Sequence, residues 1–113
     1  MALPLNIFKT ITNVVSTNSV GIYTAPVGYA SVVILAQAAN TGNTTETVTF
    51  SHQRTVAGIA VTTEIVKSFP IPANDSASFL DGKLVLESND VLVISGSNSS
   101  NIKFTGSILE TLK

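Results

Sequence analysis

Three of the seven acidic residues in the chain, Asp81, Glu87 and Asp90, fall within the short stretch DGKLVLESND. Clustered carboxylates are the groups that bind calcium or act as acid and base in catalysis. A calcium loop places oxygen ligands at alternate positions before a glycine, and the spacing here does not match that pattern. Asp81–Gly82 is instead a tight-turn dipeptide, and an aspartate placed like Asp90 accepts hydrogen bonds from backbone N–H groups of a turn. We therefore predict turn residues here, with no metal site and no cofactor.

The single histidine, His52, lies in the segment TFSHQR. A catalytic triad would require a serine and an aspartate beside it, and serine is so abundant in this chain that proximity alone carries no weight. The sequence contains neither a G-x-S-x-G motif nor a phosphate-binding loop. It also contains no cysteine, which excludes thiol catalysis and thiolate metal sites. We predict that the protein is not an enzyme.

Other classes of binding function are also disfavoured by the composition. The formal net charge is -1 and no basic track is present, so we predict no nucleic-acid partner. The longest apolar run, VVILA (32–36), is too short to cross a membrane as a helix, and MALPLNIFKTITN lacks the basic start of a signal peptide. Glycan sites use exposed aromatic rings, and there is no tryptophan. Tyr29 either packs over the turn at Pro26 or offers a platform to a glycan.

The balance of residue types points to a folded protein with an unusual surface. Charged residues make up 12% of the chain, against about 25% in ordinary globular domains, while apolar residues make up 44%. Serine, threonine and asparagine must therefore coat most of the surface, and such groups cost less to remove from water than charges do. Two interpretations remain open at this point: a generic β-rich composition, or a surface that packs against other subunits.

Short β-branched runs separated by turn residues account for most of the chain, and no helical period extends over a full helix. The predicted strands span 7–16, 20–25, 30–40, 46–54 and 62–71, followed by KLVLE, VLVISGS and NIKFTGSILETL. The segment TVAGIAV is either a bulged loop or a hairpin tip, and Pro70 places its strand at a sheet edge or a strand end. We predict one all-β domain over residues 1–113, an antiparallel β-sandwich of jelly-roll type with about eight strands.

The strands at 32–36 and 91–94 are apolar on both faces, whereas a strand with one solvated face alternates. We predict that Leu84, Leu86, Leu92 and Ile94 are buried between two sheets, with Ile34 facing them. The opposite faces need a cover, either loops of the same chain or a neighbouring subunit. Because the chain has few long loops, we predict a homo-oligomer. The residues that we expect at its subunit interface are Val33, Leu35, Val91 and Val93.

Two segments, IYTAPVGYASVVILAQAAN (22–40) and IPANDSASFLDGKLVLESNDVLVISGS (71–97), resemble small all-β virion proteins of tailed bacteriophages, notably marine cyanobacterial phages. In these proteins a Tyr-Thr-Ala-Pro turn leads into a long apolar strand, and a Pro-containing loop precedes the later strands. The resemblance implies a non-enzymatic structural protein of the virion, an accessory or decoration subunit of the capsid or of the tail and baseplate. The alternative is a receptor- or glycan-binding module at the tip of a tail fibre.

Overall fold

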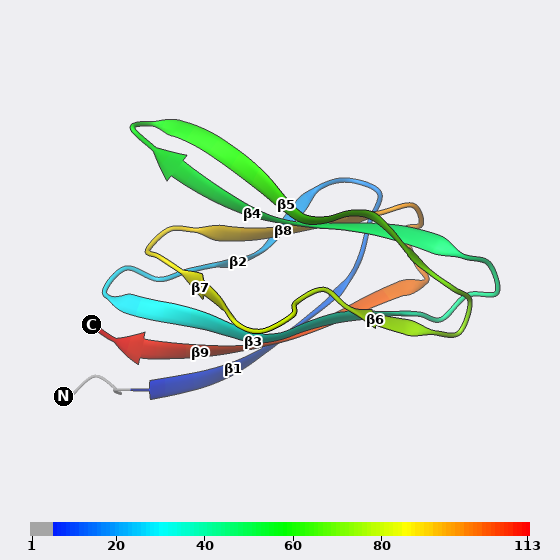
Figure 1. Ribbon diagram of the computed structural model, residues 1–113, viewed down its shortest axis with the longest axis horizontal. Coiled ribbons are helices and arrows are strands. Elements are labelled where there is room, and N and C mark those ends of the chain that lie inside the picture. Colours follow the sequence, from blue (N-terminus) through cyan, green and yellow to red (C-terminus); the bar gives the residue numbers. More distant parts are fainter. Residues whose placement is uncertain (1–5) are drawn as a thin grey trace.

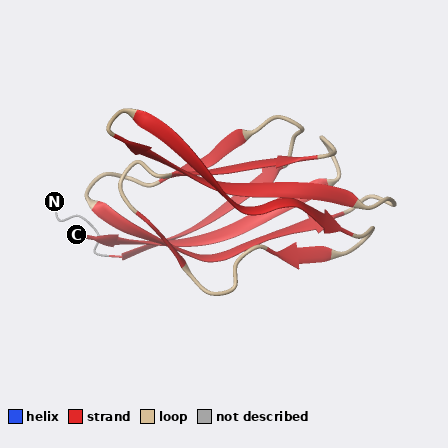
Figure 2. Ribbon diagram, turned by 45° about the horizontal axis from the view of Figure 1, so that its top comes forward, coloured by secondary structure: helices blue, strands red, loops and turns tan. Residues whose placement is uncertain are grey.

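The computed structural model describes residues 6–113, which form nine strands and no helix (Figures 1 and 2). No helix in this range is therefore long and apolar enough to cross a membrane. The expected absence of a signal peptide depends partly on residues 1–5, which lie outside the described residues. The strands are β1 (Asn6–Val14), β2 (Val20–Thr24), β3 (Tyr29–Asn40), β4 (Glu46–Val56), β5 (Ile59–Ile71), β6 (Ser76–Ser78), β7 (Leu84–Leu86), β8 (Val91–Gly96) and β9 (Ile102–Leu112).

The strands form two antiparallel sheets packed face to face (Figure 2). The five-stranded sheet has the order β1-β9-β3-β6, with β7 also paired to β3, and the four-stranded sheet has the order β2-β8-β4-β5. Because β6 and β7 pair with different parts of β3, they are two halves of one interrupted strand. Counted in this way there are eight strands, four in each sheet. Successive strands change sheet at every step except from β4 to β5, which is the order of a jelly roll. The predicted all-β sandwich is confirmed.

The interruption between β6 and β7 lies where the sequence predicts a tight turn. Gly82 has a φ of 118°, a conformation that side chains disfavour, so the chain leaves the edge of β3 here and rejoins it at β7. β6 was not predicted, since its residues were assigned to a loop. Its three small residues, Ser-Ala-Ser, carry no apolar alternation, and only pairing with β3 makes them a strand.

The β4–β5 hairpin extends past the end of the sandwich. Its tip is the dipeptide Ala57–Gly58, with φ values of 54° and 79°, as in a type I′ turn. β8 pairs with β4 only as far as Gln53, so the last residues of the hairpin form a two-stranded arm that rises away from the other strands (Figure 1). The hairpin-tip interpretation of TVAGIAV is therefore confirmed, and Pro70 lies in β5, an edge strand as predicted.

The core lies between the two sheets and is built from their inward-facing side chains. Phe50 of β4 stacks against both Phe79 and Phe104, with ring centroids 5.5 and 5.6 Å away. Leu86, Leu92 and Ile94 are fully buried, as predicted. Leu84, which was expected to be buried as well, is only partly buried and packs against the core cluster from its margin.

The predicted position of Ile34 in the core is wrong, because 40% of its surface is exposed. The pairing of β3 with β9 shifts between Val33 and Leu35, which makes Ile34 an extra residue in a β-bulge. Before the bulge the inward position is Val33, and after it the inward position is Ala36. The bulge thus shifts by one residue which side chains of β3 point inward. The inward and outward positions before the bulge therefore do not predict those after it.

Candidate functional site

The carboxylates of the DGKLVLESND segment do not converge on one point. Asp90 is almost completely buried, and its Oδ2 accepts a hydrogen bond from the backbone N–H of Glu87 at 2.9 Å. Glu87 forms an ion pair with Arg54 at 2.7 Å, while Asp81 lies exposed in the turn before Gly82. Residues 6–113 contain no group of three His, Cys, Asp or Glu side chains placed to hold a metal ion. The predicted role of Asp90 as a turn residue is confirmed.

The environment of Asp90 fixes its charge state. His52 Nε2 lies 3.0 Å from its Oδ2, and Arg54 Nε lies 3.4 Å from its Oδ1. Burial by itself would raise the pKa of Asp90, but the hydrogen bond from Glu87 N–H and the contacts with His52 and Arg54 outweigh it and lower the pKa. Within residues 6–113 no serine hydroxyl bonds to His52. The pair therefore holds the β7–β8 turn against β4 and lacks the nucleophile of a triad.

A second polar cluster joins the two sheets at their interior. The hydroxyl of Tyr23 on β2 donates to Glu110 on β9, and its oxygen lies 2.9 Å from the hydroxyl of Ser31 on β3. Burial, reinforced by the bond to Glu110, raises the pKa of Tyr23 above its usual range. Glu110 is only 2% exposed, and Lys9 Nζ reaches its carboxylate at 3.2 Å. Since the hydroxyl of Tyr23 is bonded inside the sandwich, this ring cannot serve as an exposed platform for a sugar.

Sequence reasoning missed this cluster, although a signal for it was present. Glu110 stands in phase with Ile102, Phe104 and Ile108, all of which face the core from β9. A carboxylate in phase with buried apolar residues must find partners inside the fold, because an unpaired buried charge is too costly. The alternation along NIKFTGSILETL therefore contained the information that Glu110 would be buried and paired.

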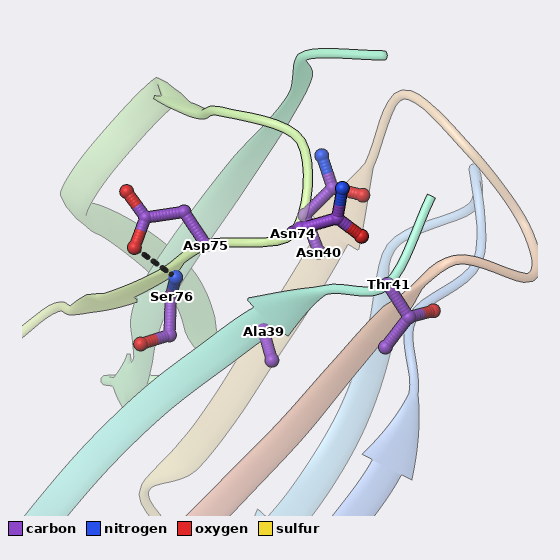
Figure 3. Close-up of a pocket in the computed structure, with 6 residues that line it drawn as sticks. All are labelled: Ala39, Asn40, Thr41, Asn74, Asp75 and Ser76. Carbon is purple, nitrogen blue, oxygen red and sulfur yellow. Dashed lines mark hydrogen bonds between the residues drawn. The ribbon is translucent and has the colours of Figure 1, made fainter. Parts of the chain in front are cut away.

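A shallow hollow lies between the end of β3 and the β5–β6 loop, lined by Ala39, Asn40, Thr41, Asn74, Asp75 and Ser76 (Figure 3). Its most buried polar side chain, Asn40, donates to the carbonyls of Thr44 and Ile71 and accepts from the N–H of Gly42. Asp75 accepts from the N–H of Ser76 at 2.8 Å. The hydrogen bonds of Asn40 and Asp75 connect the loops at this end of the sandwich and stabilise it.

The residues expected at a subunit interface lie at three different kinds of position. Val33 is fully buried in the core of the monomer, so it has no surface to offer a neighbour and its assignment is corrected. Leu35, beyond the bulge, pairs with Ser107 and lies half-buried on the outer face of the five-stranded sheet. Val91 and Val93 lie half-buried on β8, out of phase with the inward-facing Leu92. They belong to the outer face of the four-stranded sheet.

The outer face of the five-stranded sheet carries a row of apolar side chains that the sequence analysis did not identify. The pairing registers place Phe8 beside Leu109, Leu109 beside Val32, and Val32 beside Val85, from β1 to β7. We call these four residues the apolar row. Phe8 is 76% exposed and Val85 is 60% exposed. Only the register of four strands that are distant in sequence brings these residues together.

A scan against models of protein families found no match, and a search of curated proteins found no relative. Among solved structures, one of Bacillus endospore appendages, a family of disulfide-linked pili, matches with a TM-score of 0.53 at 19% identity, over 96% of this chain and 88% of the other. An icosahedral particle of IBDV matches with a TM-score of 0.59 at 12% identity, over 96% of this chain and 31% of the other. The Gx strain of infectious bursal disease virus gives 0.56 at 13% identity, over 95% and 32%.

At these identities the likeness concerns the fold alone. The same β-sandwich occurs in a pilus and in viral particles, and this chain spans about a third of the length of the two viral chains.

Proposed function

We propose that this protein is a non-enzymatic structural subunit of a particle, most specifically an accessory or decoration subunit of the virion of a tailed bacteriophage, on its capsid or on its tail and baseplate. It acts through contacts between subunits. The observation that carries the proposal is the half-buried apolar pair Val91 and Val93 on the outer face of one sheet, together with Leu35 on the outer face of the other. Neither face is covered by a helix within residues 6–113.

The side-chain chemistry supports a structural role. The single histidine is bonded to Asp90, and the buried tyrosine and glutamate are bonded to each other across the sandwich. No buried polar side-chain atom in the described part of the chain lacks a hydrogen-bond partner. No such atom is therefore left unbonded to bind a substrate. The fold it shares with a pilus and with viral particles agrees with this role.

Light scattering at increasing protein concentration tests the proposal. We expect the wild-type protein to associate, and we expect Val93→Lys to weaken association while leaving the thermal melt nearly unchanged, because Val93 points away from the core. Thr62→Lys is the matched control: it adds the same charge to the exposed edge strand β5 of the same sheet. A protein that stays monomeric at about 1 mM, where an association worth about 4 kcal/mol would be detected, contradicts the proposal.

A further inference from the structure

The outer face of the five-stranded sheet carries mainly uncharged polar and apolar side chains. Its outward positions on β1 are Asn6, Phe8, Thr10, Thr12 and Val14. On β9, Thr111, Ser107 and Thr105 pair with Asn6, Thr10 and Thr12. The apolar row crosses this face. On β1 and β9 these polar side chains flank it, and at its other end Val85 lies between the exposed Lys83 and Glu87. Among the outward positions of the five strands, as the register and burial alternation define them, the only charged residue is Lys103, near the far end of β9. Lys9 and Glu110 alternate to the inner side, where they pair with each other.

The size of this face matches what a specific contact needs. The strands of this sheet, with 9, 11, 12, 3 and 3 residues, hold 38 residues in all. At about 3.4 Å per residue and about 4.8 Å between strands they present roughly 600 Å². Two such faces together approach the roughly 1,200 Å² at which specific protein interfaces begin. The arm, another exposed apolar feature, has only three residues on each of two strands beyond Gln53, and roughly 100 Å² by the same measure. The arm alone is therefore too small to be the principal contact.

We propose that the outer face of the five-stranded sheet packs against the same face of a second copy of this chain, with the apolar row as the centre of the contact. The inference rests on the proposed structural function. It adds a second contact surface to the one at Val91 and Val93 and names a second copy of the chain as its partner. Within its strands this face carries one charge, that of Lys103, so two copies of it can meet with little repulsion, as a twofold contact requires. Stacked sheets keep their strands within about 30° of each other and about 10 Å apart, which brings one apolar row over the other.

The apolar rows of the two copies can be superposed in two ways, and the sizes of the side chains favour one of them. A twofold axis along the strands places Phe8 of one copy over Val85 of the second copy, and Leu109 over Val32. An axis along the row places two Phe8 rings together and two Val85 side chains together, which crowds one end and leaves a gap at the other. Close packing favours large side chains opposite small ones. The contact that we propose therefore pairs Phe8 with Val85 of the second copy.

The chain has no cysteine, so introduced thiols report this pairing directly. Phe8→Cys and Val85→Cys proteins are mixed in equal amounts and oxidised gently. We expect disulfide-linked heterodimers from the mixture, formed at least tenfold faster than homodimers of either variant alone, because facing thiols are held near each other. Fast homodimers of Phe8→Cys alone, or no enrichment of the heterodimer, would overturn the inference.

Light scattering provides the second test. We expect Val85→Lys to weaken association of the wild-type chain at least tenfold, and we expect Ile59→Lys, which places the same charge on the 67% exposed Ile59 of the arm, to have little effect. If wild-type protein associates and Val85→Lys associates equally well while Val93→Lys or Ile59→Lys does not, this face is not the contact, although the structural function stands. If wild-type protein does not associate at all, the proposed function fails first, and any occupant of the face is then a different protein.

Discussion

Replacing Asp90 with alanine removes the acceptor that closes the turn between β7 and β8. The carboxylate accepts from Glu87 N–H at 2.9 Å and contacts His52 Nε2 at 3.0 Å, and it has almost no exposure to water that could replace these partners. A buried donor left without a partner costs about 1–3 kcal/mol, and the loss of a charged hydrogen bond adds to this. We expect Asp90→Ala to lower the free energy of unfolding by about 2–4 kcal/mol.

Asp90→Asn is the matched variant, because its amide oxygen can still accept from Glu87 N–H while the charge facing His52 and Arg54 is lost. Its pH dependence should differ from that of the wild type. The pKa of Asp90 is lowered in the folded protein, so its contribution is fully present above the unfolded pKa of about 3.9 and is lost as the pH falls through the folded pKa. We therefore expect wild-type stability to fall more steeply below about pH 4 than the stability of Asp90→Asn.

Urea titrations followed by circular dichroism measure both effects, since the chain has no tryptophan to report unfolding. The titrations are made at pH 7 and in steps down to about pH 2 for the wild type and the two variants. If Asp90→Ala unfolds within about 0.5 kcal/mol of the wild type, the turn does not depend on this carboxylate. If wild type and Asp90→Asn have the same slope in acid, the lowered pKa is not a source of stability.

Leu92→Ala, which empties a fully buried site between the sheets, should cost about 2–5 kcal/mol in the same titration, and a neutral result would contradict the register of β8. Ile34→Thr, at the exposed bulge, should stay within about 0.5 kcal/mol of the wild type, whereas Val33→Ala next to it should cost more than about 1 kcal/mol; the reverse order would place the bulge wrongly. Thermal melts in calcium and in a chelator should coincide, and a stabilisation by calcium of several degrees would show a cation site that the separated carboxylates do not suggest.

The alternation of apolar and polar residues was sufficient to predict the architecture. Most strands were placed correctly, because each one is bounded by residues that favour turns, and the buried Leu92 and Ile94 followed from a period of two. Turn chemistry contributed as well: Asp90 accepts a backbone N–H as its position predicted, and Gly82 takes the positive φ expected beside an aspartate. These features are local, so a single sequence contains them.

The features that the sequence did not reveal depend on pairing between distant strands. In the run VVILA every residue is apolar, so either phase of alternation fits it, and only the register against β9 shows that Ile34 is the extra residue. β6 is a strand solely because it pairs with β3. The apolar row joins residues from position 8 to position 109, and no local pattern relates them. This is why the sequence pattern showed neither that Val33 is buried nor that Phe8 and Val85 lie exposed in one row.

The polar clusters inside the fold and the outer face of the five-stranded sheet differ in their chemical groups. Two pairs of groups that could carry out acid–base chemistry, His52 with Asp90 and Tyr23 with Glu110, are bonded to each other and partly or fully buried. The outward positions of the five-stranded sheet carry mainly uncharged polar and apolar side chains. A face that stays in contact with water is usually rich in charged residues, which keep a protein soluble. Covering such a face costs little desolvation, because hydroxyls lose far less than charges do on burial. The outer face of the five-stranded sheet therefore suits the contact between subunits that we propose.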